Sequence, residues 1–189
     1  MPASPLFVLV ALGSNLGDSR ALLREAMDRL AAWSSTPIRR SSLWISAPVD
    51  CPPGSPAFLN AAVGLTPFPG ETPETLLARL QELEQEFGRR PKVVLNEPRP
   101  LDLDLIVFGE ERRDTPRLIL PHPRAHLRRF VLEPWLEVEA GATVPGLNPT
   151  VADLLHTLRE AEAQAGRGQE CRRLDEVTFS PRERGKPRS

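Results

Sequence analysis

Apolar residues along the chain form short runs separated by proline and glycine, a pattern typical of a chain that mixes strands and helices. The run from Leu6 to Leu12, ended by Gly13, is continuous and predicts a central strand buried on both faces. Shorter or more loosely alternating runs predict the other strands. These lie at Ile38 to Ala47, Ala57 to Thr66, Leu101 to Phe108 and, as a brief addition, Arg117 to Leu120.

Helical spacing of the apolar residues appears between these strands. Asp18 is a capping residue for a helix expected to run to about Trp33. Thr72, followed by proline at the first helical position, starts a second helix that Gly88 ends. Two further helices are expected in the second half of the chain, at Phe130 to Val138 and Thr150 to Ala163.

The order of these elements, strand-helix-strand-strand-helix-strand, predicts an α+β fold. We expect a ferredoxin-like plait, in which an antiparallel sheet carries its helices on one face, elaborated by C-terminal helices. One domain is expected over residues 1–165. Residues 166–189 form a C-terminal extension, in which Cys171 to Ser180 can add an edge strand and Pro181 to Ser189 is expected to be a disordered tail.

Composition narrows the class of protein. The formal net charge of −1 over 189 residues argues against a nucleic-acid partner, because phosphate-backbone binding usually requires a basic surface. The two cysteines, Cys51 and Cys171, lie far apart, which favours free thiols in a reducing compartment. The first apolar run is too short to span a membrane and lacks the flanks of a signal peptide. We therefore expect a cytoplasmic protein with no membrane partner.

The most informative polar residues are Asp102 and Asp104, which alternate with leucines in the predicted fourth strand. Alternate strand residues share a face, so the two carboxylates point the same way and suit hard divalent cations. The loop before this strand carries the cations Arg89, Arg90, Lys92 and Arg99. From spacing alone, two interpretations stay open: a polyphosphate–magnesium site, or a solvated acidic strand beside a basic loop.

Four blocks decide between these interpretations because their order and spacing occur together. The chain resembles the 6-hydroxymethyl-7,8-dihydropterin pyrophosphokinase family of folate biosynthesis from about Leu6 to Ala140. The four blocks that carry the resemblance are Ala11-Leu12-Gly13-Ser14-Asn15-Leu16-Gly17-Asp18, Phe58-Leu59-Asn60-Ala61-Ala62-Val63, Pro98-Arg99-Pro100-Leu101-Asp102-Leu103-Asp104-Leu105, and Leu120-Pro121-His122-Pro123-Arg124 with Arg128 and Phe130-Val131-Leu132.

The resemblance implies an ATP-dependent enzyme that moves the β,γ-pyrophosphate of ATP onto the hydroxymethyl oxygen of the reduced pterin and leaves AMP. It implies two Mg²⁺ ions on Asp102 and Asp104, with Arg89 and Arg99 also at the catalytic centre. The implied ATP contacts are Gln81, Glu84, Lys92, Arg99, Leu105, Arg117, His122 and Arg128. The implied pterin contacts are Ser46, Pro48, Val49, Phe58, Asn60 and Phe130, with the ring between the two phenylalanines.

The chain departs from the family pattern in the basic loop. Pro91 stands where members often carry a second arginine, and we expect Arg90 or Lys92 to replace it; Asn96 stands where many have an aromatic residue. Two alternatives to the enzyme follow: a plait that binds pterin or nucleotide without turnover, and an RNA-binding plait. We expect small-molecule partners only and a monomer.

Overall fold

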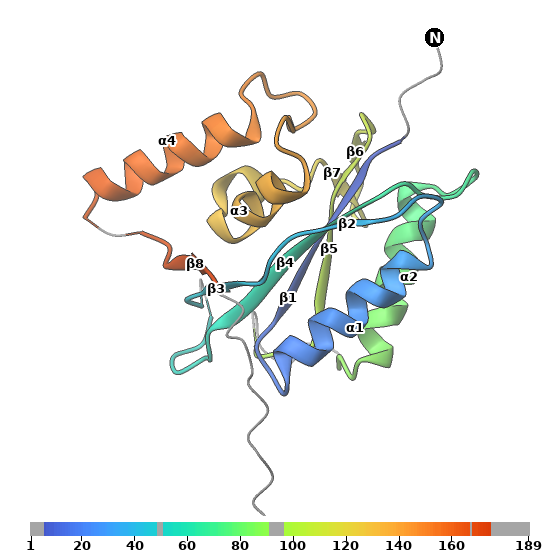
Figure 1. The fold of residues 1–189 in the computed structure, drawn as a ribbon, viewed down its shortest axis with the longest axis horizontal. Helices are drawn as coiled ribbons and strands as arrows, with labels where there is room; N and C mark the ends of the chain where they lie inside the picture. The colour runs from blue at the N-terminus through green and yellow to red at the C-terminus, as the bar shows by residue number, and fades with distance from the viewer. Residues whose placement is uncertain (1–5, 49–50, 91–96, 167, 175–189) are drawn as a thin grey trace, which may run out of the picture.

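The structure is a computed structural model that describes residues 6–48, 51–90, 97–166 and 168–174. Its main sheet has the strand order β5-β1-β4-β3-β8, with β2 also paired to β4, and the pairings among these strands are antiparallel (Figure 1). The strands of this sheet are β1 (Val8–Ser14), β2 (Arg39–Arg40), β3 (Trp44–Ser46), β4 (Phe58–Leu65), β5 (Asp102–Phe108) and β8 (Cys171–Arg173).

The helices begin where the sequence places capping residues. Asp18 accepts a hydrogen bond from the backbone N of Ala21 at the start of α1. Thr72 and Thr150 each form a capping box, at the start of α2 and α4 respectively. The helices are α1 (Ser19–Ala31), α2 (Pro73–Glu86), α3 (Arg129–Val138), α4 (Val151–Gln164) and the short 3₁₀ helix η1 (Ala125–Leu127).

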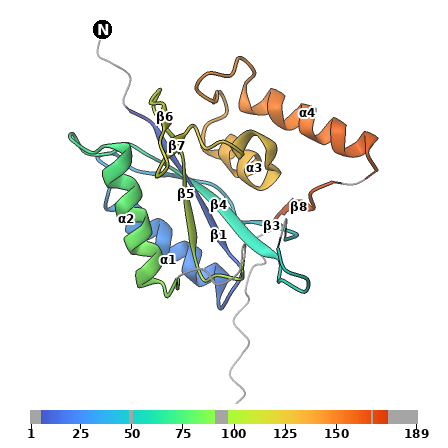
Figure 2. The ribbon, with the colours of Figure 1, turned by 180° about the vertical axis from the view of Figure 1, so that it is seen from behind.

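Helices cover both faces of the sheet, which corrects the expectation that they share one face. Alternate residues of β1 divide between two apolar cores: Val8, Val10 and Leu12 pack in the core that α1 and α2 cover. Leu9 packs in the second core, with residues of α3 and α4. Figure 2 shows the two helical layers from behind, with α1 and α2 on one side and α3 and α4 on the other. The plait is therefore a three-layer structure.

The strand predicted from Ile38 to Ala47 is two strands, β2 and β3, which corrects the single-strand prediction. Arg39 pairs with Gly64 of β4, whereas Trp44 pairs with Asn60, so the register shifts by one residue between them. Ser41 lies at the break, where its Oγ accepts a hydrogen bond from Ala62 N at 2.8 Å. The extra residue is accommodated as an irregularity, which alternation in the sequence does not reveal.

Two small elements complete the described chain. Of the short strand predicted at Arg117 to Leu120, only Ile119–Leu120 is extended (β7), and it pairs with β6 (Arg113–Asp114) in a separate ribbon. Of the strand predicted from Cys171 to Ser180, Cys171–Arg173 forms β8, and residues 175–180, like the expected tail from Pro181 to Ser189, lie outside the described residues. Within the described ranges, no helix combines the length and the apolar character that crossing a bilayer requires.

Candidate active site

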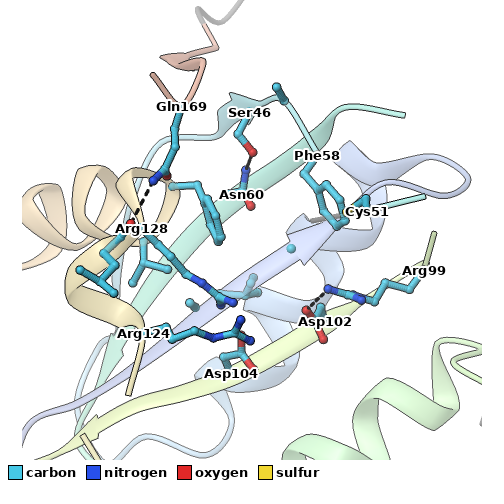
Figure 3. A pocket seen from close by; sticks show the side chains of 17 residues that line it. Ser46, Cys51, Phe58, Asn60, Arg99, Asp102, Asp104, Arg124, Arg128 and Gln169 are labelled. Carbon is cyan, nitrogen blue, oxygen red and sulfur yellow. Dashed lines mark hydrogen bonds and ion pairs between the residues drawn. The ribbon is translucent and has the colours of Figure 1, made fainter. Parts of the chain in front are cut away.

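A cavity of about 250 Å³ opens at one end of the sheet, on the face of α3 and α4 (Figure 3). Its floor is β1, where Gly13 pairs with Asn60 of β4 on one side and Asp102 of β5 on the other. A Cβ at Gly13 would lie 3.7 Å from Asn60 Oδ1 and 3.8 Å from the Cβ of Asp102. The glycine therefore leaves the floor open between an amide and a carboxylate whose backbones are two strand spacings, about 10 Å, apart.

Asp102 lies between two arginines. Its Oδ1 is 2.7 Å from Arg89 Nη1 and its Oδ2 is 2.8 Å from Arg99 Nη2, and all three side chains are largely buried. Each oxygen of the Asp102 carboxylate is therefore paired with a cation that could also meet a phosphate oxygen. The sequence predicted these three residues together, and the structure brings them into direct contact.

Arg99 is positioned by Asn15, from the motif that follows β1. Asn15 is 5% exposed; its Oδ1 accepts from Arg99 N at 2.9 Å, and its backbone N donates to Arg99 O at 3.2 Å. Its Nδ2 donates to Pro56 O at 3.3 Å, which ties the loop before β4 to the same point. The glycine-serine-asparagine block of the sequence thus has a structural role. Its Asn15 joins the loop before β4, at Pro56, to the loop before β5, at Arg99.

Asp104, one pleat further along β5, has a different environment. Burial raises its pKa to about 6, the negative charge of Asp102 adds to this, and the charges of Arg128, Arg99 and Arg89 oppose it. A carboxylate held in this way is destabilised until a cation approaches. Figure 3 shows Arg124 and Arg128 extending toward it from the opposite wall.

Two phenylalanines on opposite walls line the cavity, Phe58 from β4 and Phe130 from α3. Each lies beneath an arginine: Arg99 is 5.5 Å from the centroid of Phe58, and Arg128 is 5.4 Å from that of Phe130. Flat heterocycles stack favourably on aromatic rings such as these. The two arginines place positive charge next to both rings. The structure thus places both predicted phenylalanines at one cavity.

Asn60 is 4% exposed and held in a fixed orientation. Its Nδ2 donates to Ser46 Oγ at 2.9 Å, and more weakly to Trp44 O at 3.4 Å (Figure 3). Ser46 and Trp44 both belong to β3, so the pairing of β3 with β4 sets the direction of the amide. The hydrogen bonds fix the amide nitrogen and leave its oxygen toward the floor at Gly13.

A second cavity of about 280 Å³ lies between β5, α2 and the loop after β6. Leu105, Arg117 and His122, three of the predicted ATP contacts, line it. Among the described residues, Asp104 alone lines both cavities. Asp104 therefore lies beside both cavities.

His122 is held as a neutral imidazole. Burial lowers its pKa to about 4, and the charges of Arg128 and Arg124 lower it further. Its Nδ1 accepts a hydrogen bond from Arg124 N at 3.3 Å, which leaves the proton on Nε2. His122 can therefore donate one hydrogen bond into the second cavity without adding charge.

Glu84, another predicted ATP contact, is turned into the protein. Its Oε1 accepts a hydrogen bond from Leu103 N at 2.7 Å and is paired with Arg89. Burial raises its pKa to about 7, while the bond from Leu103 and the charge of Arg89 lower it. Because β5 lies at the edge of the sheet, Glu84 satisfies a backbone donor that would otherwise lack a strand partner.

The remaining predicted residues are less closely associated with the cavities. Gln81 is exposed on α2 and lines neither cavity. Pro48 lines an adjoining groove, while Ser46 and Ala47 reach the first cavity. Val49 and Lys92 lie outside the described residues.

Several lining residues were not predicted as contacts. Arg124 lies within the histidine-proline-arginine block, so its charge was a usable signal. Cys51, Leu127 and Gln169 carry no local signal, because only the folded chain brings them to the cavity.

The comparisons with known proteins agree with this geometry. A model of the 7,8-dihydro-6-hydroxymethylpterin-pyrophosphokinase family matches residues 9–140. The chain belongs to this family. Relatives named 2-amino-4-hydroxy-6-hydroxymethyldihydropteridine pyrophosphokinase include one from Bacillus subtilis, 38% identical over 134 residues, which cover 68% of this chain and 75% of the relative. One from Pseudomonas aeruginosa is 37% identical over 139 residues, covering 73% and 83% respectively.

Some pyrophosphokinase relatives are much longer. The mitochondrial folate synthesis bifunctional protein of Arabidopsis thaliana is 39% identical over 146 residues, 77% of this chain but only 25% of the relative. A solved structure described as HPPK-DHPS in complex with substrates superposes with a TM-score of 0.69 at 11% identity, covering 87% of this chain and 45% of the other. The chain thus spans about a quarter to a half of these larger proteins, and the structural likeness concerns the pyrophosphokinase fold.

Proposed function

We propose that the protein transfers the β,γ-pyrophosphate of ATP to the hydroxymethyl oxygen of 6-hydroxymethyl-7,8-dihydropterin, giving AMP, the pterin pyrophosphate and a proton for folate biosynthesis. The observation that carries this proposal is that Asp104 lines both cavities. An acceptor in one cavity and a nucleotide in the other would have their reacting atoms at that carboxylate. Such positioning supplies much of the rate enhancement in phosphoryl transfer.

The first cavity suits the pterin. Its planar ring would lie between Phe58 and Phe130, and the amide of Asn60 would read the donor–acceptor edge of the ring. Ser46 fixes that amide at 2.9 Å, so little freedom is lost when the ring binds. The hydroxymethyl group would then point across β1 toward the carboxylates of β5.

The second cavity suits the nucleotide. Its polar residues include His122, Arg117 and Thr115 in addition to Asp104, and Leu105 adds an apolar surface. Arg89, Arg99 and Arg128 surround the carboxylates and would meet the phosphate oxygens as charge develops. Because these cations stabilise the transferred group, the proposal requires no protein side chain as a general base.

The donor set fits magnesium. Asp102 and Asp104 present oxygen ligands from one strand face. The pKa of Asp104 is raised because its ionised form is destabilised, and a bound cation would stabilise that form. In the described ranges, no cluster of three or more His, Cys, Asp or Glu residues could hold a metal. Two carboxylates with substrate phosphates are a usual magnesium environment. Bound Mg²⁺ would neutralise phosphate charge, and we propose two ions.

The test is a nucleotide assay on the purified protein with Mg²⁺, ATP and 6-hydroxymethyl-7,8-dihydropterin, with the adenine nucleotides separated by chromatography. Pterin-dependent AMP without ADP is expected. ADP would identify a phosphoryl-transferring kinase instead, and tight pterin binding without nucleotide change would favour a binding protein. The same reaction with the metal chelated measures the dependence on Mg²⁺, and the sedimentation mass tests the expected monomer.

An RNA-binding plait is disfavoured by the position of α3 and α4. Such plaits bind single strands on an open sheet face with stacking aromatics. Here α3 and α4 pack on the face opposite α1 and α2, so each face has its own buried core.

The cytoplasmic location and the division of the chain into a domain and an extension at residue 165 stay predictions.

A further inference from the structure

The segment from Gly168 to Leu174 lies beyond the part of the chain that the family model matches, yet it reaches the first cavity. As β8 it pairs with β3, placing Cys171 opposite Ser46. Immediately before β8, the carbonyl of Glu170 accepts a hydrogen bond from Ala47 N at 3.1 Å. The segment therefore fixes the strand that orients the amide of Asn60.

The side chain of Gln169 makes two hydrogen bonds to the opposite wall. Its Nε2 donates to Leu127 O at 2.9 Å, and its Oε1 accepts from Arg129 N at 3.0 Å. These two backbone groups lie on either side of Arg128, which covers Phe130. Figure 3 shows Gln169 reaching from the C-terminal segment to this point.

One of these bonds caps the N-terminus of helix α3. The backbone N–H groups in the first turn of a helix have no partner within the helix. The residue at the N-cap position of α3, Arg128, makes no side-chain capping bond. Gln169 supplies the missing acceptor from 40 residues further along the chain. The direction of Arg128 and Phe130 thus depends on a residue outside the helix.

The backbone of Gln169 is itself held from two sides. Arg129 Nη1 donates to Gln169 O at 3.1 Å, and Gln169 N donates to Glu162 Oε1 of α4 at 3.1 Å. Arg129 and Glu162 are paired at 3.1 Å, which closes the group. Gly168 permits this approach, because a Cβ there would lie 2.8 Å from Glu162 Oε2 and 3.1 Å from its Cβ.

We infer that Gln169 is a positioning residue for the pterin: it sets the spacing between the Phe130 wall and the β3–β4 wall and so determines pterin affinity. The inference rests on the proposed function for the identity of the ligand. Arg129, Glu162 and the pairing of β8 with β3 hold the glutamine backbone in place while its amide holds α3. The nucleotide cavity includes no residue of this segment, and only Arg128 links the segment to the phosphates, so ATP affinity should depend on it less than pterin affinity does.

The test compares Gln169→Ala with Gln164→Ala, a matched control at an exposed position at the end of α4. The dissociation constant of 6-hydroxymethyl-7,8-dihydropterin is measured by calorimetry, and KM for each substrate by AMP release. Loss of two hydrogen bonds should weaken pterin binding about ten-fold or more in Q169A. KM for ATP should rise less than the pterin dissociation constant, because only Arg128 links Gln169 to the phosphates, and Q164A should match the wild type. Thermal unfolding checks that each variant is folded.

A third variant, Gln169→Glu, keeps the acceptor for Arg129 N and loses the donor to Leu127 O. Pterin affinity between those of wild type and Q169A is expected. Unchanged pterin affinity in Q169A would overturn the inference. Equal weakening of pterin and ATP, in step with a lower unfolding temperature, would also overturn it and leave a structural role only. A wild type that binds pterin but releases no AMP would refute the proposed reaction while leaving the binding comparison intact; one that binds no pterin would refute both.

Discussion

The two carboxylates of β5 should affect stability in opposite directions. Asp102 is paired with Arg89 and Arg99, at 2.7 and 2.8 Å. Asp104 is buried beside Asp102, and its pKa is raised from 3.8 to about 6. A carboxyl group whose pKa is raised on folding destabilises the folded state whenever it is ionised. Asp104→Asn should therefore stabilise the ligand-free protein at neutral pH, and Asp102→Asn should destabilise it.

The size of the effect follows from the pKa. A rise of 6 − 3.8, about 2 units at 1.36 kcal/mol each, gives an upper bound of about 3 kcal/mol. For a domain of this size, that corresponds to an unfolding temperature higher by at most roughly 6–12 °C. The cost is absent below the unfolded pKa, grows as pH rises from about 4 to 6, and is complete above the folded value. The advantage of D104N should follow the same course.

The assay is urea unfolding of wild type, D104N and D102N at pH 4, 5, 6 and 7.5, with chelator and without nucleotide. Both variants should also lose pyrophosphoryl transfer by orders of magnitude, which separates stability from activity. The reasoning is refuted if D104N is less stable than wild type at pH 7.5. It also fails if the advantage at pH 7.5 persists undiminished at pH 4.

Three further outcomes follow from the site. Glu84→Ala should lower the free energy of unfolding by about 1–3 kcal/mol, measured in urea, because Leu103 N at the sheet edge loses its acceptor; Glu84→Gln, which keeps an acceptor, should be more stable than Glu84→Ala. Gly13→Val should raise KM for the pterin more than ten-fold by filling the cavity floor, whereas Gly13→Ala, whose Cβ has only ordinary contacts, should stay near wild type in the AMP assay. His122 should stay neutral from pH 5.5 to 8, so its ring resonances should not titrate in that range; a His122 titration near pH 6.5 by NMR would contradict this.

Local rules account for much of the fold and for the centre of the site. The strand period of two places Asp102 and Asp104 on one face whatever the rest of the chain does, and their positions confirm it. Asp18, Thr72 and Thr150 mark helix starts because a capping side chain bonds to a backbone N–H a few residues ahead. The strand order β5-β1-β4-β3 is that expected of the predicted plait.

Contacts between distant segments had no such local signal. Sequence spacing could not place Asn60 and Asp102 on either side of Gly13, since that depends on the registers of two strand pairs. Glu84 looks like an ordinary exposed helix residue until α2 packs beside the edge of β5 and its carboxylate meets Leu103 N. Helical periodicity likewise does not say which face of a sheet a helix covers, so the second layer was not foreseen.

The sequence by itself determined which residues we propose for the chemistry, because strand alternation, capping and the motif blocks are patterns that extend over only a few residues. The tertiary structure decided how those residues are held: an amide oriented by β3, a carboxylate shared by two cavities, and Gln169 holding the start of α3 from 40 residues away. Hydrogen bonds and burial between distant segments form only when the chain closes, so their partners are fixed by packing and register rather than by spacing along the sequence.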